Sequence, residues 1–210
     1  MRTLALYFTS ITCGFCLMAL EIVGARMLFP SFGSSIDIWA AIISVFILSL
    51  SLGYVLGGRL ADRSTSNQPL ALVIVGASLL YFLLPIWALP FTEALGPTVH
   101  TARWGVLFAA TVLFLPPSLL LGLISPMLVK LVFVSAERVG TTTGTLYAVG
   151  SVGNVAGVLF ADFVLLAYVE LNTSIFAMGA VMAVLGLAHL FVRMPAAQAP
   201  AAAVPAGATP

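Results

Sequence analysis

Long apolar runs separated by short polar connections make up almost the whole chain. Six runs reach the roughly 20 mainly apolar residues that a helix needs to cross a bilayer, and they cover residues 4–29, 36–60, 69–90, 104–130, 144–168 and 172–193. The pattern predicts an all-α integral membrane protein whose six transmembrane helices form one domain, residues 1–194. Residues 195–210 are almost entirely Ala and Pro, which predicts a disordered tail or an extended linker.

The composition excludes several classes of protein. Of 210 residues, 61% are hydrophobic and only 7% are charged, whereas soluble domains carry about 25% charged residues. Eight basic and seven acidic residues give a net charge of +1, so the chain has no basic surface for DNA or RNA. A soluble enzyme, a disordered chain and a nucleic-acid-binding protein are therefore excluded, and the lipid bilayer is the first expected partner.

The basic residues predict how the helices are oriented. Cytoplasmic connections of membrane proteins are enriched in Lys and Arg. With both termini inside, the outer side carries Arg103 alone and the inner side carries six basic residues, namely Arg2, Arg59, Arg63, Lys130, Arg138 and Arg193. We therefore expect a multi-pass protein of the plasma (inner) membrane with both termini in the cytoplasm.

The second and fifth spans share a sequence motif. Residues 51–63 align with residues 151–163, and both copies contain the pattern GxxxGxxxAD. Residues four apart lie on one face of a helix, so Gly53 and Gly57 form one smooth stripe, and Gly153 and Gly157 form another. Such stripes let membrane helices approach closely, so helix packing is the simplest interpretation.

The two motif copies run in opposite directions under this topology. Inverted three-plus-three repeats occur within each half of major-facilitator transporters. The sequence is thus compatible with a half-major-facilitator-like fold containing such a repeat, although short apolar motifs also match by chance.

Polar residues inside the predicted spans are candidates for function, because a charge at the bilayer centre costs about 2.5–3.5 kcal/mol. Glu21 either has a substrate or proton role or makes a structural pair or hydrogen bond. Asp162 lies at a similar depth and either forms an acidic site for a cation beside Glu21 or lies at the outer interface. Arg26 lies on a different face of its helix from Glu21 and is expected to reach the outer head groups or another helix. Tyr54 and Asn154, which align in the two motif copies, complete the residues expected to bind a solute or an ion.

The inner end of the second span carries a further motif. Residues 58–63, with the sequence GRLADR, resemble the cytoplasmic loop of major-facilitator proteins, in which Asp and Arg pair with neighbouring helices. Arg59, Asp62 and Arg63, together with Lys130 of the fourth span, are therefore expected to latch the cytoplasmic side. Simple anchoring by positive charge is the alternative.

Proline and cysteine residues add two interpretations. Pro116, Pro117 and Pro126 remove backbone donors and predict that the fourth span is broken at a binding site or kinked for packing. Cys13 and Cys16 lie on one face of the first span, and we interpret them as residues that fill space. The sequence contains no catalytic, metal-binding or cofactor-binding motif, so neither a metal nor a cofactor is expected.

The order of the motifs resembles a known family. Residues 21–35 (EIVGARMLFPSFGSS), 52–63 (LGYVLGGRLADR), 121–130 (LGLISPMLVK) and 144–157 (GTLYAVGSVGNVAG) are similar to the membrane region of spermidine synthase-like proteins, often described as fused major-facilitator/spermidine synthase proteins. The resemblance covers residues 10–190. Fused members also carry a soluble aminopropyltransferase-like domain, which residues 195–210 cannot supply, so no enzymatic activity is expected from this chain.

Two functions fit these observations. The first is a transporter, or one half of a homodimeric transporter, for a small solute such as a cationic polyamine attracted by Glu21 and Asp162. The second is a non-catalytic membrane subunit that anchors or regulates a partner. That partner is either a larger membrane complex or a separate aminopropyltransferase-like protein.

Overall fold

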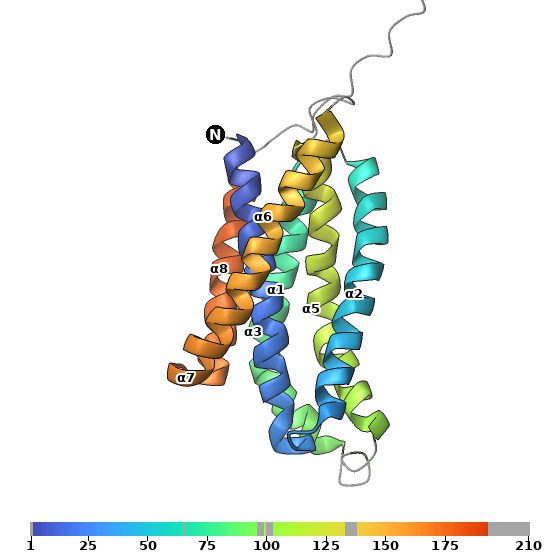
Figure 1. Ribbon diagram of the computed structural model, residues 1–210, viewed down its shortest axis with the longest axis vertical. Helices are drawn as coiled ribbons and strands as arrows, with labels where there is room; N and C mark the ends of the chain where they lie inside the picture. Colours follow the sequence, from blue (N-terminus) through green and yellow to red (C-terminus); the bar gives the residue numbers. More distant parts are fainter. Residues whose placement is uncertain (1, 65, 96–98, 100–102, 133–137, 193–210) are drawn as a thin grey trace, which may run out of the picture.

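The computed structural model describes residues 2–64, 66–95, 99, 103–132 and 138–192 (Figure 1). All six predicted spans are present as helices long and apolar enough to cross a membrane, and these residues form no sheet. Arg193 and the predicted tail lie outside the described residues. The helices are α1 (Arg2–Phe32), α2 (Ile36–Arg63), α3 (Gln68–Ala94), α5 (Arg103–Val132), α6 (Val139–Phe160) and α8 (Leu171–Phe191).

The fifth span is longer and less regular than its hydrophobic pattern indicates. After α6 the chain continues as a π-helical turn, η2 (Ala161–Leu165), and a short helix, α7 (Leu166–Tyr168). The span therefore runs from Val139 to Tyr168. Single π-helical turns within helices are frequent at functional sites, and no feature of the hydrophobic pattern predicts this one.

Local chemistry explains two of the helix boundaries. At the end of α1, Gly33 adopts a φ of 78° and its N–H donates to the Phe29 carbonyl over 2.9 Å. Glycine reaches this left-handed conformation without steric cost, which allows the chain to leave the helix. At the start of α3, Pro69 stands in the first turn, where its missing N–H breaks no helical hydrogen bond.

The fourth span contradicts one of the two alternatives predicted for it, because α5 is not broken at its prolines. The helix is continuous from Arg103 to Val132 and contains Pro116, Pro117 and Pro126. Each proline removes one N–H, and neighbouring hydroxyl groups add bonds to the same helix. The Ser118 hydroxyl donates to the Phe114 carbonyl over 2.5 Å, and the Thr111 hydroxyl donates to the Leu107 carbonyl over 2.7 Å. The prolines free the carbonyls of Val112, Leu113 and Gly122, so these hydroxyl bonds lie beside the prolines and do not replace the lost ones.

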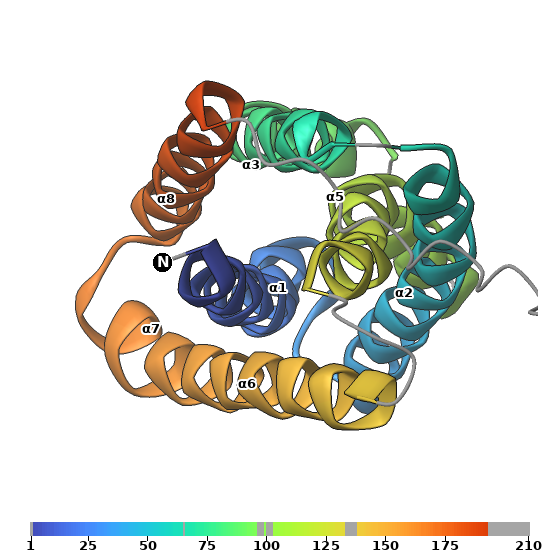
Figure 2. The ribbon, with the colours of Figure 1, turned by 90° about the horizontal axis from the view of Figure 1, so that it is seen from above.

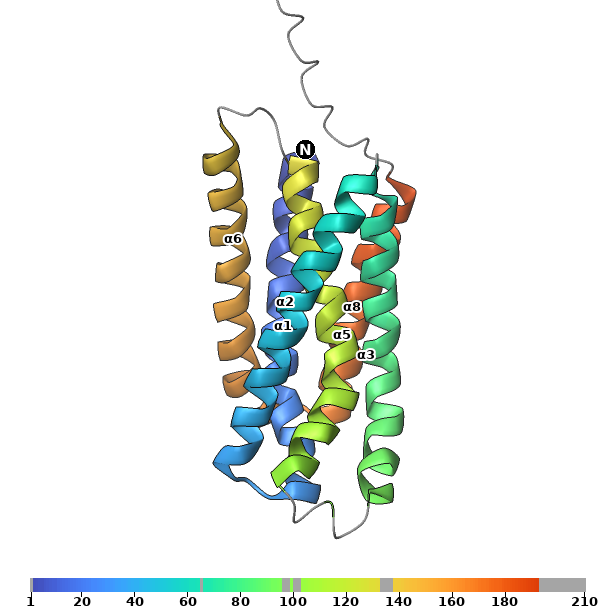
Figure 3. The same ribbon diagram turned by 90° about the vertical axis from the view of Figure 1, so that its right-hand side faces the viewer.

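Two helices occupy the centre of the bundle. Seen from above, α1 and α5 lie inside a ring made of α2, α3, α6 and α8 (Figure 2). Helices α1, α3 and α6 run away from the end that holds the N-terminus, and α2, α5 and α8 run back toward it (Figure 3). The most extensive contacts join α2 to α5, α1 to α6, and α3 to α8.

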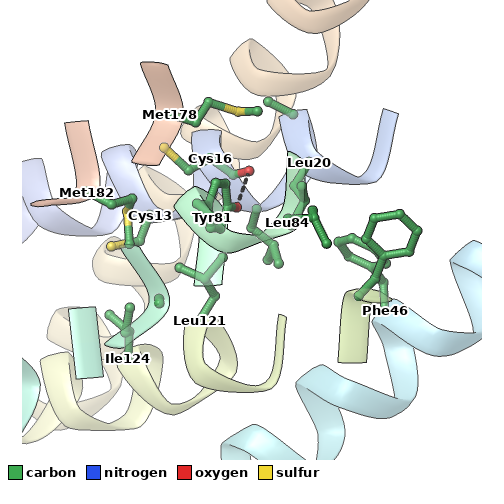
Figure 4. Close-up of a cluster of buried hydrophobic side chains, with 14 of the residues drawn as sticks. Cys13, Cys16, Leu20, Phe46, Tyr81, Leu84, Leu121, Ile124, Met178 and Met182 are labelled. Atoms are coloured by element: carbon green, nitrogen blue, oxygen red, sulfur yellow. Dashed lines mark hydrogen bonds between the residues drawn. The ribbon is translucent and has the colours of Figure 1, made fainter. Parts of the chain in front are cut away.

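The core of the bundle is apolar and closely packed around α1. Tyr81 is fully buried, and its hydroxyl donates to the Cys16 carbonyl over 2.8 Å (Figure 4). Cys13 and Cys16 are both buried as free thiols among these side chains, in agreement with a space-filling role. Large apolar residues also cover the outside of the bundle; Leu79, for example, is 63% exposed. An outer surface of this kind suits contact with lipid chains.

Candidate functional site

A cavity of about 150 Å³ lies between α1, α2, α5 and α6, and we call it the central cleft. It occupies the half of the bundle nearer the N-terminus, since its residues come from the first half of α1 and the second halves of α2 and α5. Apolar side chains such as Leu17 and Leu50 form part of its wall. Six polar side chains also line it: Ser10, Tyr54, Ser125, Tyr147, Ser151 and Asn154.

The apolar core of the bundle forms one wall of the central cleft. Cys13, Leu121 and Ile124 belong to the core cluster and also line the cavity (Figure 4). All three are buried, so the rigid centre of the bundle holds this side of the cleft in place. A cavity with one well-packed wall keeps its lining side chains in fixed positions.

Close helix packing shapes the cleft on the side of α6. A Cβ on Gly14 would lie 2.6 Å from the Asn154 Oδ1 and 2.7 Å from the Gly150 carbonyl oxygen. A Cβ on Gly153 or Gly157 would overlap the Ile11 or Phe15 carbonyl. Only glycine permits these approaches, and they bring Asn154 against α1 at the cleft.

The packing of α2 on α5 repeats this arrangement. A Cβ on Gly53 would lie 2.6 Å from the Leu119 carbonyl oxygen, and one on Gly57 would lie 2.5 Å from the Leu123 carbonyl oxygen. Gly122 of α5 in turn meets the Cα and carbonyl of Leu50. The four glycines that the motif predicts as packing residues, Gly53, Gly57, Gly153 and Gly157, are therefore buried at close helix contacts.

Tyr54 and Tyr147 stand on opposite sides of the cleft. Helices α2 and α6 carry them and are not packed together along their length (Figure 2). The exposed fractions are 46% for Tyr54 and 52% for Tyr147, and both side chains line the cleft. The pair therefore flanks an opening of the cleft between these two helices.

Comparison with protein-family models, with curated proteins and with solved structures finds no match. The resemblance to spermidine synthase-like proteins stays a prediction, and the geometry of the chain itself carries the functional interpretation.

None of the described residues that line the central cleft carries a formal charge. Glu21, an acidic candidate from the sequence, is half-buried on α1. Gly14, Leu17 and Glu21 share one face of α1 because they are three and four residues apart. Glu21 therefore lies about one turn beyond the cleft, toward the opposite end of the bundle.

The structure does not bring the other two charged candidates into the cleft. Asp162 is exposed within η2, beside the buried Ala161, and this exposure fits the interface alternative rather than an acidic site shared with Glu21. Arg26 is also exposed, and its guanidinium lies 5.6 Å from the centre of the Phe29 ring. Of the five predicted binding residues, Tyr54 and Asn154 line the cleft.

Of the four residues predicted to latch the cytoplasmic side, Lys130 contacts a neighbouring helix. The half-buried Lys130 ammonium donates to the Ala61 carbonyl near the end of α2. A positive charge is favourable there because the carbonyl end of a helix carries a partial negative charge. Arg59, Asp62 and Arg63 are exposed, which fits anchoring at the membrane surface.

Sequence reasoning missed four polar lining residues, Ser10, Ser125, Tyr147 and Ser151. A signal for two of them was present, because Tyr147, Ser151 and Asn154 follow helical spacing and share one face of α6. Ser10 and Ser125 stand alone among apolar neighbours, and only the packing of four helices brings them to one cavity.

A second buried polar group was also missed. The His189 Nε2 lies 2.7 Å from the Thr9 hydroxyl, which donates its own proton to the Ala5 carbonyl over 2.9 Å. The pair thus forms a buried hydrogen bond between α1 and α8. The Asn67 amide donates to the carbonyls of His189 and Val192 over 2.9 and 2.7 Å. These bonds tie the end of α8 to α1 and to the start of α3.

Proposed function

We propose that this protein is a transporter, or one half of a homodimeric transporter, for a small solute that binds in the central cleft. The observation that carries the proposal is a polar cavity inside a bundle of membrane-spanning helices, where two glycine-packed helix pairs meet. Polar groups are costly in the membrane interior and are therefore retained mainly where they serve a function.

We further propose that the two pairs belong to an inverted repeat, with α1–α3 as one copy and α5, α6 and α8 as the other. Several contacts support this equivalence. Gly53 and Gly57 pack on Leu119 and Leu123, whereas Gly153 and Gly157 pack on Ile11 and Phe15. In both cases the contacted residues are four apart, and the helices of one copy run opposite to those of the other (Figure 3).

Further equivalent positions lie at the cleft. Gly14 follows Ile11 by three residues, as Gly122 follows Leu119, and these glycines meet Gly150 and Leu50 respectively. By the same correspondence Tyr54 matches Asn154, and both line the cavity. The cleft thus lies between the two copies, which is where inverted-repeat transporters bind their substrates.

In the proposed transport cycle, the hydrogen bond of Lys130 makes the two ends of the bundle different. In the repeat, Lys130 corresponds to Ile22 of α1, whose side chain cannot donate a hydrogen bond. A polar latch therefore holds the N-terminal end of the bundle without an equivalent at the corresponding position of the opposite end. In the proposed cycle, loss of the hydrogen bond between Lys130 and the Ala61 carbonyl opens the N-terminal end of the bundle. The residues that line the cleft keep their positions on their own helices.

Labelling from both sides of the membrane tests transport without knowledge of the solute. Cys13 and Cys16 are replaced by Ala, and Ser125→Cys places one thiol in the cleft. Membrane vesicles of both orientations are treated with a membrane-impermeant maleimide. We expect Ser125→Cys to react from either face, because alternating access exposes the cleft to each side in turn.

Two control variants make this experiment decisive. Leu79→Cys lies on the lipid-facing surface and should react from neither side, and Asp162→Cys should react only from the face opposite the N-terminus. Labelling of Ser125→Cys from one face alone would count against transport.

The second candidate function is a membrane subunit that binds a partner, and the outer face of α6 favours it. This helix buries the smallest share of its residues. A Cβ on Gly140 or Gly144 would meet no atom within 4 Å, so these small residues face outward, as in helices that associate in membranes. Purification in mild detergent followed by native mass spectrometry tests this candidate: a stable hetero-complex favours the subunit, and a homodimer favours the transporter half.

A further inference from the structure

We infer that the solute of the central cleft is a small, uncharged, polar molecule that is recognised by hydrogen bonds. This inference rests on the proposed transport function and identifies the class of substrate. It replaces a polyamine, the solute suggested by the acidic residues in the sequence, with a neutral polyol- or amide-like molecule.

The first ground is the absence of charge among the described residues that line the cleft. A cation that leaves water for a membrane-embedded cavity loses its hydration, and only an opposite charge with well-placed hydrogen bonds compensates for this loss. Asp162 is exposed at η2, and Glu21 lies one turn beyond the cleft on α1. Neither carboxylate therefore stands where a bound cation would need it.

The second ground is the chemistry of the polar side chains. Hydroxyl groups both donate and accept hydrogen bonds, and an amide offers two donors and a carbonyl acceptor. Five hydroxyl groups and one amide line the cleft, contributed by α1, α2, α5 and α6. A solute that carries hydroxyl or amide groups can satisfy these donors and acceptors from several directions.

The third ground is size. The cavity has a volume of about 150 Å³. Cavities that hold drug-sized ligands are larger, at roughly 300–1,000 Å³. A compact solute of about six non-hydrogen atoms, such as glycerol, fits this volume, since an engineered cavity of the same volume binds benzene.

Flux measurements in proteoliposomes test the inference with defined probes. Purified protein is reconstituted, and the entry of glycerol and of urea is followed by light scattering, alongside uptake of radiolabelled putrescine. We expect glycerol or urea to enter at least about tenfold faster than in protein-free liposomes, a ratio that corresponds to about 1.4 kcal/mol of barrier. Putrescine uptake should remain at the protein-free level.

A charge placed in the cleft should change this selectivity. Asn154→Asp keeps the shape of the side chain but adds a carboxylate, so neutral flux should fall about tenfold and putrescine uptake should rise above the protein-free level. The matched control is Asp162→Asn, which alters an exposed residue outside the cleft and should leave both fluxes unchanged. An unaltered elution volume in size-exclusion chromatography shows that each variant is folded.

The outcomes separate this inference from the proposed function. Neutral flux that depends on Asn154 supports both. Putrescine uptake without neutral flux supports transport and overturns the inference about the substrate. No flux of any probe, together with one-sided labelling of Ser125→Cys, overturns both, whereas two-sided labelling without neutral flux overturns the inference alone.

Discussion

Single side chains hold the end of α8 on α1, and the pair of Thr9 and His189 is the clearest case. Both residues are buried and lie 2.7 Å apart at the Thr9 hydroxyl and the His189 Nε2. A buried polar group that loses its partner retains the cost of its desolvation, about 1–3 kcal/mol. The bond therefore matters most when only one partner is removed.

Thr9→Val removes the hydroxyl and leaves the buried His189 Nε2 without its hydrogen-bond partner, so we expect a loss of about 1–3 kcal/mol of stability. The double variant Thr9→Val/His189→Leu removes both polar groups and should recover most of that loss. Thermal unfolding in detergent of the two single variants and the double variant measures the coupling. Additive losses would show that the two side chains do not depend on each other.

Glu21 is a second single residue that leads to a prediction. Its carboxylate lies about one turn beyond the cleft, where it can carry a proton between solution and the path of the solute. We expect Glu21→Gln to abolish uptake driven by an imposed pH gradient while downhill flux of the neutral probe continues. Transport assays with and without the gradient check this, and Asp162→Asn is the matched control because its carboxylate lies outside the cleft. Gradient-driven uptake that is intact in Glu21→Gln would contradict a proton-carrying role.

At the scale of the helices, the sequence predicts the existence of the elements better than their internal shape. All six spans follow from hydrophobic runs, and the glycine stripes of α2 and α6 follow from spacing. The π-helical turn at Ala161–Leu165 does not, because its residues suit an α-helix as well as a π-helical turn. The prolines of α5 left two alternatives open, a break and a kink for packing, and the continuous helix rules out the break.

The residues of the candidate site, too, were only partly predictable from the sequence. Tyr54 and Asn154 could be predicted from the alignment of two motifs, and both line the cleft. Placing Glu21 relative to the cleft, and Asp162 outside it, requires the rotation of each helix about its axis. Hydrophobic runs do not determine that rotation, because these helices are apolar on nearly every face.

The glycine stripes lead to a prediction about helix packing. Gly153→Val places a branched side chain against the Ile11 backbone, where even a Cβ overlaps the carbonyl. We expect a loss of at least about 1–3 kcal/mol, the usual cost of overpacking, seen as a lower unfolding temperature in detergent. Gly144→Val is the matched control on the same helix, because a Cβ there meets no atom within 4 Å. Equal effects of the two variants would contradict the close contact of α6 with α1.

Lys130 gives a prediction about the balance between conformations. A charge at a helix carbonyl end contributes about 0.3–1 kcal/mol, so Lys130→Met should shift the population toward the form open at the N-terminal end by about twofold to fivefold. The rate at which Ser125→Cys reacts with maleimide from that side should rise by the same factor. Arg63→Met, an exposed neighbour at the end of α2, should leave that rate unchanged. Identical maleimide reaction rates with and without Lys130→Met would contradict a latch role for Lys130.

For the whole molecule, the main feature is that helices from opposite halves of the chain pack together. Helix α2 packs on α5 and α6 packs on α1, so the cleft lies where the two halves meet. Inverted-repeat transporters work by moving one half against the other around a fixed site. This arrangement explains why residues as far apart in the sequence as Ser10 and Asn154 line the same polar cavity.

The most direct measurement is a reversible cross-link across the opening of the cleft. In the Cys13→Ala/Cys16→Ala background, Tyr54→Cys and Tyr147→Cys are joined by a bifunctional methanethiosulfonate, and glycerol flux in proteoliposomes is recorded before and after reduction. We predict that the cross-link lowers flux to the protein-free level and that reduction restores it, while each single-cysteine variant is unaffected by the reagent. Flux that is unchanged in the cross-linked protein would show that solute does not pass through the central cleft.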